Sequence, residues 1–498
     1  MLLQNKIGAL TQNVKSLVNR RLPACASTRA LLTGGLLFGA ALATAGGDVI
    51  AYIADQEQDE ASEVYRVDVK TSTVSKLSPP MVAGGGAVYL DIDAKGKNVA
   101  YMADQDIDEV YELYNVDLKS GAVRKLNAPL DGTKRVEFFQ FDAKGTGVVY
   151  QADQDSTAVL ELYRTDLKTS TITKLSAPMV LGGDVIFFQV DAQGKSVVYV
   201  ADQEIDEVFE LYRVDVKTGV VTKLNPDFAP GQLVDDFCID PKGKFVVYVA
   251  NQDSTATYEL YKADLKTGLV AKLNDPLVAG GNVIQLQVDG KGKTVVYSAD
   301  QVIDELLELY RVDIKTGFVS KISAPQVPGG GVGSGFQVSP KGDVVVYRAS
   351  QEVVDKRELY KVDLKTSTVT KISPPLIAEG DVPAGFRFDP KGKSVAFTAD
   401  NLIQGDRNLF IADLKASSTV QLNPPLPVDG RVSSSFIQFD AKGKTLNYIA
   451  DQDQNNVDEA YQVDLKTGAV IQLNEPLVPE GDVRTLRVQG SIEPQLLL

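Results

Sequence analysis

Residues 98–146 read NVAYMADQDIDEVYELYNVDLKSGAVRKLNAPLDGTKRVEFFQFDAKGT, and the chain repeats this pattern nine times. The anchor aromatic residues of the copies are Tyr52, Tyr101, Tyr150, Tyr199, Tyr248, Tyr297, Tyr347, Phe397 and Tyr448. Successive anchors are 49 residues apart five times, then 50, 50 and 51 residues apart. Such a fixed period is the signature of a repeat architecture, so the repeat governs the interpretation of the whole chain.

Each copy contains four short segments of alternating polarity, rich in Val, Tyr and Phe and separated by Gly, Asp, Asn and Pro. This pattern predicts antiparallel strands, and in one copy we expect them at residues 136–142, 148–151, 161–166 and 171–175. Lys-Gly and Lys-Thr-Gly stand where the hairpins need a residue that tolerates positive φ. A four-stranded unit that is copied many times predicts an all-β fold, a single large β-propeller whose blades bury their faces against one another.

The segments VVYVADQ, ELYRVDVKTG, VTKLN and the pattern FxVDPKGK resemble the TolB-type propeller repeat, a relative of the WD-repeat blade. The resemblance covers residues 49–490 and implies a propeller fold, but it implies no particular activity. The sequence shows no counterpart of the small α/β domain that precedes the propeller in TolB. The role of TolB in the cell envelope is therefore not carried over.

The two ends of the repeat region predict how the ring closes. Residues 49–53 match a second strand, whereas residues 483–488 match a first strand that has no successors. Joining the two segments in one blade leaves no open edge and produces nine blades. The alternative is eight blades, because the copy that contains NLIQGDRN at residues 401–408 is the most divergent.

The first 45 residues carry five Lys or Arg residues and no acidic residue, and they end in an apolar run at residues 31–45. The run is too short to span a bilayer and closes with Ala43-Thr44-Ala45, which predicts an export signal cleaved near Ala45. We expect a signal at residues 1–45, the propeller at residues 46–490 and a tail at residues 491–498. The mature chain would be periplasmic or secreted, with no transmembrane insertion. An uncleaved anchor is the alternative, and the choice between Sec and twin-arginine export stays open.

Composition excludes several functions. The formal net charge is −15, and it becomes −20 without the five positive charges of the signal, which argues against binding to nucleic acid. The chain has no His, so it can form neither a Ser-His-Asp triad nor an imidazole metal site. Its two Cys residues cannot form a disulfide framework.

Charge is expected to differ between the two faces of the propeller. The loops between the second and third strands and the loops between blades should share one face, which would be acidic. The AKGK and DLKTG turns should share the other face, which would be basic. Representative residues are Asp104, Asp106, Asp108, Glu109 and Asp184 on the acidic face, and Lys144, Lys168, Lys195, Lys217, Lys242 and Lys266 on the basic face.

The acidic loops present oxygen ligands at alternating positions, which is the arrangement that Ca²⁺ prefers. The candidate ligand sets are Asp104, Asp106, Asp108 and Glu112, and Asp202, Glu204, Asp206 and Glu210. Glu109 and Glu207 occupy the sixth position, where a tight calcium loop has Gly. The alternative is a polar hairpin connection whose Asp side chains bind their own backbone. We expect no other cofactor.

Polar residues recur at one level of the innermost strand. The candidates for lining the central channel are Asp91, Gln140, Gln189, Asp236, Gln287, Gln337, Arg387, Gln438 and Arg487, with Cys238 at the equivalent position beside Asp236. One interpretation is a water-filled tunnel, and the other is hydrogen bonding between neighbouring blades.

The first hypothesis for function is a non-enzymatic, monomeric scaffold that binds an envelope or extracellular protein or glycan. The second hypothesis is a polysaccharide hydrolase or lyase that uses paired carboxylates. Its candidates are Asp235 and Asp236 together with Asp91. Neighbouring residues of a strand point to opposite faces, which argues against Asp235 and Asp236 acting as a pair.

Overall fold

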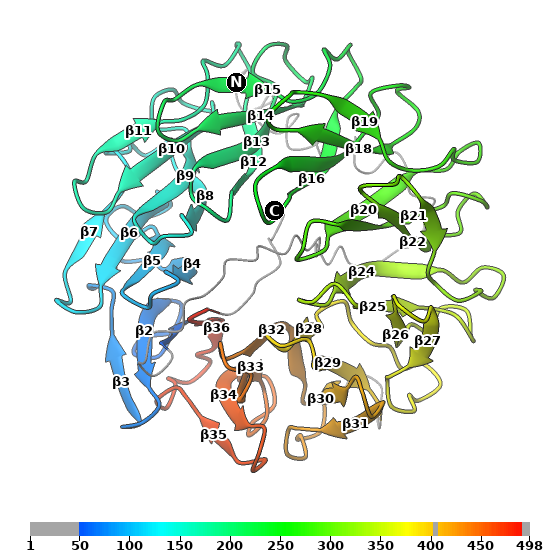
Figure 1. Cartoon of the computed structure of the whole chain (residues 1–498). Coiled ribbons are helices and arrows are strands. Elements are labelled where there is room, and N and C mark those ends of the chain that lie inside the picture. The colour runs from blue at the N-terminus through cyan, green and yellow to red at the C-terminus, as the bar shows by residue number, and fades with distance from the viewer. Residues whose placement is uncertain (1–48, 402–406, 491–498) are drawn as a thin grey trace, which may run out of the picture. The chain divides into compact units, whose positions relative to one another are not determined.

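A computed structural model describes residues 49–401 and 407–490. The expected signal at residues 1–45, its cleavage near Ala45 and the tail at residues 491–498 lie outside the described residues. The described part forms nine four-stranded antiparallel sheets arranged as a ring, a nine-bladed β-propeller (Figure 1). This confirms the predicted fold class and excludes eight blades. No helix in the described ranges is long and apolar enough to cross a membrane.

Every blade has the same order of strands from the centre outwards. The innermost strands are β36 (Val483–Val488), β4 (Ala87–Ile92), β8 (Val136–Phe141), β12 (Val185–Val190), β16 (Val234–Ile239), β20 (Val283–Val288), β24 (Val332–Val338), β28 (Arg387–Phe388) and β32 (Val432–Phe439). The second strands are β1 (Ile50–Ala54), β5 (Asn98–Ala103), β9 (Gly147–Ala152), β13 (Ser196–Ala201), β17 (Phe245–Ala250), β21 (Thr294–Ala299), β25 (Val344–Ala349), β29 (Ser394–Asp400) and β33 (Thr445–Ala450).

The two outer positions complete each sheet. The third strands are β2 (Glu63–Asp68), β6 (Glu112–Asp117), β10 (Glu161–Asp166), β14 (Glu210–Asp215), β18 (Glu259–Asp264), β22 (Glu308–Asp313), β26 (Glu358–Asp363), β30 (Arg407–Asp413) and β34 (Glu459–Asp464). The outermost strands are β3 (Thr73–Lys76), β7 (Val123–Lys125), β11 (Ile172–Lys174), β15 (Val221–Lys223), β19 (Val270–Lys272), β23 (Val319–Lys321), β27 (Thr368–Lys371), β31 (Ser418–Gln421) and β35 (Val470–Gln472). We number the blades from the one that holds β1.

The first blade closes the ring with strands from both ends of the chain. Its order is β3-β2-β1-β36, and Tyr52 of β1 stands opposite Leu486 of β36. Because β36 supplies the backbone partners of β1, the mixed blade predicted from the sequence is confirmed.

The core lies between blades as well as within them. Second-strand and third-strand aromatic rings stack across each sheet, as Tyr199 and Tyr212 do with ring centroids 5.5 Å apart. Apolar clusters join neighbouring blades; Val198 and Leu211 of the fourth blade pack with Phe237 of the fifth. A blade buries its second face only against its neighbour, which explains why the fold needs the whole ring.

Candidate functional site

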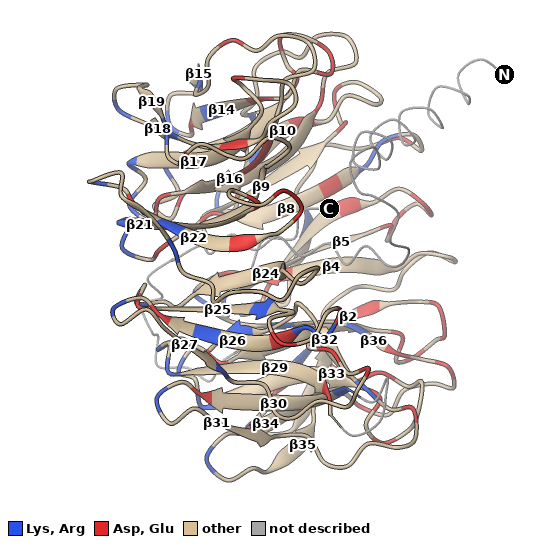
Figure 2. Ribbon diagram, turned by 90° about the vertical axis from the view of Figure 1, so that its right-hand side faces the viewer, with Lys and Arg blue, Asp and Glu red and all other residues tan. Residues whose placement is uncertain are grey.

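The two faces carry opposite charges, as expected. Figure 2 shows Asp and Glu residues gathered in the loops along one side of the propeller and Lys and Arg residues along the other. The acidic loops connect second strands to third strands, and the basic turns connect first to second and third to fourth strands. We call these two sides the acidic face and the basic face.

On the acidic face, most of the expected calcium ligands have protein partners. One oxygen of Asp104 accepts a hydrogen bond from the Gly86 amide (2.6 Å) and the other accepts one from the Glu109 amide (3.0 Å). Lys125 forms ion pairs with Asp106 (2.9 Å) and Glu112.

The second set repeats this arrangement. Asp202 accepts from the amides of Asp184 (2.5 Å) and Glu207 (2.9 Å), and Lys223 pairs with Glu204 (2.8 Å) and Glu210 (3.0 Å). Within residues 49–401 and 407–490, no three acidic or Cys side chains are grouped so that they could hold a metal ion. Calcium binding stays a prediction.

The polar ladder of the innermost strands forms bonds from blade to blade. The side-chain oxygen of Gln189 accepts from the Ile239 amide of the next blade (3.1 Å), and that of Gln287 accepts from Val338 (2.7 Å). Gln140 and Gln438 make the same contact with Val190 and Val488, Gln337 donates to the Phe386 carbonyl, and Arg387 and Arg487 are buried. These contacts favour the second interpretation of the ladder, in which its side chains form hydrogen bonds between neighbouring blades.

Other side chains of the innermost strands, nearer the acidic face, are exposed to solvent. Near the acidic face, eight of the nine innermost strands shift their register with the second strand, all except β28. In six of them the shift is a β-bulge at which one residue has no partner in the second strand, as at Val234/Asp236 in β16. The bulged residues Val88, Ile186 and Ile284 are 47%, 44% and 48% exposed. Neighbouring blades cover both faces of each sheet, so this exposure is toward the axis of the ring. We call this level the bulge ring.

The fifth blade places two acids in the bulge ring. Asp235 is the unpaired residue of the bulge and Asp236 follows it, and both side chains reach solvent. A bulge redirects side chains locally, so strict alternation does not apply there. The alternation rule by itself therefore no longer separates Asp235 from Asp236, and the charge of Asp235 acts on the Asp236 carboxyl group.

The surrounding ring of blades limits the water around these two acids. Burial, together with the neighbouring charge of Asp235, raises the pKa of Asp236 to about 8. Burial also raises the pKa of Asp235. Burial thus favours the protonated form of both carboxyl groups, and Asp236 keeps its proton at neutral pH, as a general acid must.

Aromatic side chains stand at the position of Asp236 in the three preceding blades. Tyr89, Phe138 and Phe187 occupy it in the second, third and fourth blades, and all three are partly exposed. The Tyr89 and Phe138 rings lie 5.7 Å apart, and Phe187 stacks on Phe237 of the fifth blade at 5.2 Å. Each ring packs against the core of the next blade, and we call their partly exposed surfaces the aromatic wall. Sequence reasoning missed it, although these are positions at which the copies differ.

Two further candidates do not belong to this site. Asp91 lies in β4, three blades from Asp236, so the structure does not bring it to the acidic pair. Cys238 is buried, and burial raises the pKa of its thiol to about 12, which makes it an unreactive core residue.

No family model and no curated protein matches the chain. Solved structures do match it, at low identity. Dipeptidyl peptidase 4 of Porphyromonas gingivalis is 12% identical with a TM-score of 0.56, and the match covers 82% of this chain and 65% of that one. A prolyl endopeptidase is 12% identical with a TM-score of 0.48, covering 74% and 55% of the two chains. TolB of Acinetobacter baumannii is 15% identical with a TM-score of 0.32, covering 65% and 79%.

These matches contradict the expectation of a non-enzymatic scaffold. Most of the structures are peptidases, two of them puromycin hydrolases, and an oligogalacturonate lyase is also among them. The expectation that the protein is not an enzyme is therefore withdrawn, without an activity being shown for this chain. At such identities the likeness itself shows a β-propeller fold and assigns no reaction. The chain spans 55% and 65% of the length of the two peptidases.

Proposed function

We propose that this protein cleaves a polysaccharide by acid–base chemistry at Asp235 and Asp236 in the bulge ring. The observation that carries the proposal is the placement of two adjacent, partly exposed acids at a bulge in a confined environment. In the chain as given, catalysis without His must rely on other acids and bases, and carboxyl pairs are a common solution.

The two acids would have different roles. With a pKa of about 8, Asp236 is protonated at neutral pH and can donate its proton to the oxygen that leaves the broken glycosidic bond. Asp235 would act as the base once it ionises. Two interacting carboxyl groups lose their protons in separate steps, so one of them stays protonated while the other is charged.

The aromatic wall supports a carbohydrate as the substrate. Sugar rings have apolar faces, and the partly exposed Tyr89, Phe138 and Phe187 add apolar surface against which such faces can pack, although Phe237 stacks on Phe187 and Arg487 lies over Tyr89. The exposed Val88, Ile186 and Ile284 extend this apolar surface around the bulge ring.

The test is hydrolysis of a panel of neutral and uronate polysaccharides by the purified protein. New reducing ends without ultraviolet absorbance indicate a hydrolase, and unsaturated, absorbing products indicate a lyase. Asp236→Asn should lower the rate by at least about 100-fold, and the wild-type rate should fall above about pH 8 as Asp236 loses its proton. Glu137→Gln, at the equivalent bulge of the third blade, is the matched control. An unchanged rate in Asp236→Asn, or no cleavage of any polysaccharide, would reject the proposal.

We also propose that the repeats are of the TolB type and that the enzyme works in the periplasm or outside the cell on envelope or extracellular glycan. The basic, acid-free segment before Ala45 supports export. Mass spectrometry of the protein from the periplasmic and secreted fractions tests this. A chain that keeps residues 1–45 in the cytoplasm would contradict it.

A further inference from the structure

We propose that a pocket on the basic face, between the second and third blades, binds a neutral sugar unit. The pocket has a volume of about 640 Å³. It lies between the ends of β6 and β7 and the turns of the third blade at residues 142–146 and 166–169. This volume lies within the range of about 300–1,000 Å³ that is typical of small-molecule sites. We call it the inter-blade pocket.

The pocket exists because one side chain is shorter than its counterparts. The third strand of six blades carries a long basic residue at one position, and the list is Arg66, Arg164, Arg213, Lys262, Arg311 and Lys361. Arg311 donates to the Leu364 carbonyl of the next blade (2.7 Å), and Lys361 donates to the Leu414 carbonyl in the same way. Arg213 donates to the Leu265 carbonyl in the same way (3.5 Å), so these three side chains cross the groove between blades. Arg164 instead pairs with Asp142 and Asp166 of its own blade.

The second blade has Asn115 at this position. An Asn side chain cannot reach the equivalent carbonyl, that of Leu167 in the third blade. Arg124 of β7 donates to that carbonyl instead. The groove beneath Arg124 is therefore left open, and Asn115 lines it.

The ninth blade shows the same effect. In the ninth blade the position holds Gln462, and a smaller pocket of about 240 Å³ lies between this blade and the first one, with Gln462 and Arg66 in its lining. Two pockets thus occur where an amide replaces the long basic side chain. This makes the inter-blade pocket a product of the sequence difference between copies.

The inter-blade pocket contains an acceptor without a donor. Asn115 is 1% exposed, its side-chain nitrogen donates to the Asn98 side-chain oxygen (3.2 Å), and its own Oδ1 has no hydrogen-bond partner. An unpaired buried acceptor is unfavourable, so a ligand hydroxyl that reaches the amide oxygen once the Asn115 side chain turns toward the pocket is favoured there.

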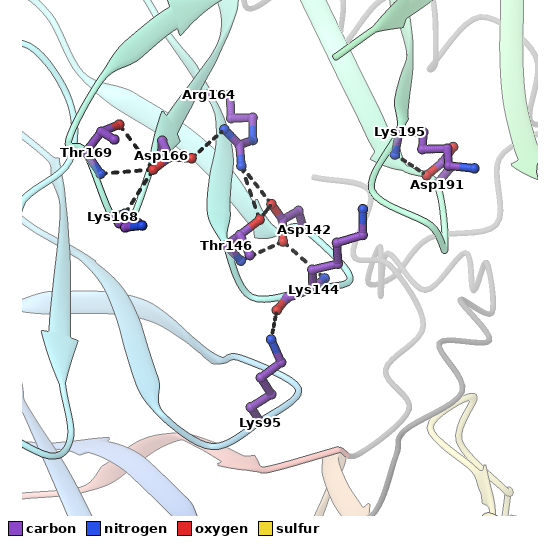
Figure 3. A network of polar contacts seen from close by, with 10 residues as sticks. All are labelled: Lys95, Asp142, Lys144, Thr146, Arg164, Asp166, Lys168, Thr169, Asp191 and Lys195. Carbon is purple, nitrogen blue, oxygen red and sulfur yellow. Dashed lines mark hydrogen bonds and ion pairs between the residues drawn. The ribbon is translucent and has the colours of Figure 1, made fainter. Parts of the chain in front are cut away.

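The charges that line the pocket balance. Asp166 accepts from the amides of Lys168 and Thr169 of its own turn, both at 3.0 Å, and the Thr169 amide bond contributes most to lowering its pKa, so the carboxylate is ionised (Figure 3). The hydrogen bond from the Ser120 amide lowers the pKa of Asp117 in the same way. Two carboxylates therefore face two cations, Arg124 and Lys168. Balanced charges and many hydrogen-bonding groups suit a neutral polyhydroxylated ligand better than an anion or a cation.

The test is ligand-observed NMR of the full chain with D-glucose, D-galactose and D-mannose, and with D-glucuronate and inorganic phosphate as charged probes. We expect at least one hexose to bind more tightly than either anion. Asn115→Arg installs the residue that the sister blades carry at this position, so it should fill the pocket with little effect on folding. It should weaken hexose binding at least tenfold. The matched control is Gln462→Arg, which fills the smaller pocket and should leave hexose binding unchanged.

Three outcomes would overturn the proposal: no hexose binds, an anion binds more tightly than every hexose, or Asn115→Arg binds as well as wild type. If Asn115→Arg fails to fold, Asn115→Ala keeps the pocket open while removing the amide, and unchanged binding in that variant would equally overturn it. The proposal is independent of catalysis in the bulge ring. The inter-blade pocket shares no residue with the bulge ring, so loss of hexose binding in Asn115→Arg and loss of polysaccharide cleavage in Asp236→Asn are separate outcomes.

Discussion

Asp184 illustrates how single residues tie the acidic loops to the propeller. Its carboxylate accepts from the Leu160 amide (2.6 Å), while its own amide donates to Asp202 (2.5 Å). Burial, with smaller contributions from the charges of Asp202, Asp153 and Asp206, raises the pKa of Asp184 to about 6. Asn282 holds the equivalent place in the sixth blade and accepts from the Tyr258 amide (2.9 Å). An uncharged amide thus makes the same backbone contact.

We predict that Asp184→Asn stabilises the protein at neutral pH but not at pH 4. The native pKa is above the usual value of 3.8, so the stability that protonation of Asp184 contributes is present below about pH 4 and is lost as pH rises through about 6. The gain at pH 7.5 should be about 1–2 kcal/mol, because one pKa unit corresponds to ~1.4 kcal/mol and solvent screens part of the effect. Urea unfolding at the two pH values measures it.

The control for this prediction is Asp117→Asn. Hydrogen bonds from Ser120 hold the pKa of Asp117 below its usual value, so its stabilising effect is present at neutral pH and lost in acid. This variant should lose stability at pH 7.5, the opposite sign. Equal destabilisation of Asp184→Asn at both pH values would contradict the assignment.

At the scale of elements, the acidic loops are hairpin connections built around their own first carboxylate. In the second blade that residue is Asp104, which bonds the loop between blades through Gly86 and its own loop through Glu109. Glu109 has φ of 60°, in the left-handed region, so the sixth position has the conformation that usually favours Gly. The fifth blade uses Asn251 in place of the Asp: it accepts from Leu233 (2.6 Å) and donates to the Thr255 carbonyl (3.3 Å).

We predict that Asp202→Ala destabilises the protein by about 1–3 kcal/mol, because two backbone amides lose their acceptor. Asp202→Asn should cost less, since its amide oxygen can keep the bond from the Asp184 amide, as Asn251 keeps the one from Leu233, while only the Glu207 amide loses its acceptor. Thermal melting of both variants measures this, and equal losses would contradict it.

Melting of the wild type in Ca²⁺ and in chelator tests the predicted calcium sites. A large upward shift in Ca²⁺ would support the predicted metal sites, and no shift would leave these carboxylates with their protein partners alone.

At the scale of the whole molecule, stability depends on closing the ring. The only contact that joins the two ends of the described chain within one sheet is the pairing of β36 with β1, in which Ile50 stands opposite Val488. An apolar cluster beneath this pair combines residues of the first and ninth blades, among them Leu486 and Ile449. An open ring would expose both this cluster and the edge of β1.

We predict that truncation after Asp482 abolishes cooperative melting and causes aggregation, because β1 loses its partner and the blade loses its inner strand. Truncation after Gly490 is the control, since it keeps β36 and removes only residues 491–498. It should change the free energy of unfolding by no more than about 0.5 kcal/mol. Calorimetry with light scattering distinguishes the two variants. A monomeric, cooperatively folded protein that lacks β36 would contradict the closure argument.

Much of the fold followed from the sequence because its signals are local and repeated. The anchor spacing from Tyr52 to Tyr448 predicted the number of blades, and the unmatched segments at residues 49–53 and 483–488 predicted the closing pair. The site was less predictable. Asp235 and Asp236 stood out as differences between copies, but simple strand alternation argued against them. Only the register of β16 with β17 shows that Asp235 is the unpaired residue of a bulge, where this alternation is interrupted.

The sequence by itself therefore determined the repeat, the strand order, the closure and the separation of charge between the faces. These features depend on the polarity of each residue relative to its neighbours in one unit, which the sequence states directly. The tertiary structure alone decided which side chains of different blades meet. Whether Arg311 crosses a groove or Asn115 leaves it open depends on the distance between blades. Likewise, the raised pKa of Asp236 depends on the ring around it, since burial is a property of atoms from many blades and not of one strand.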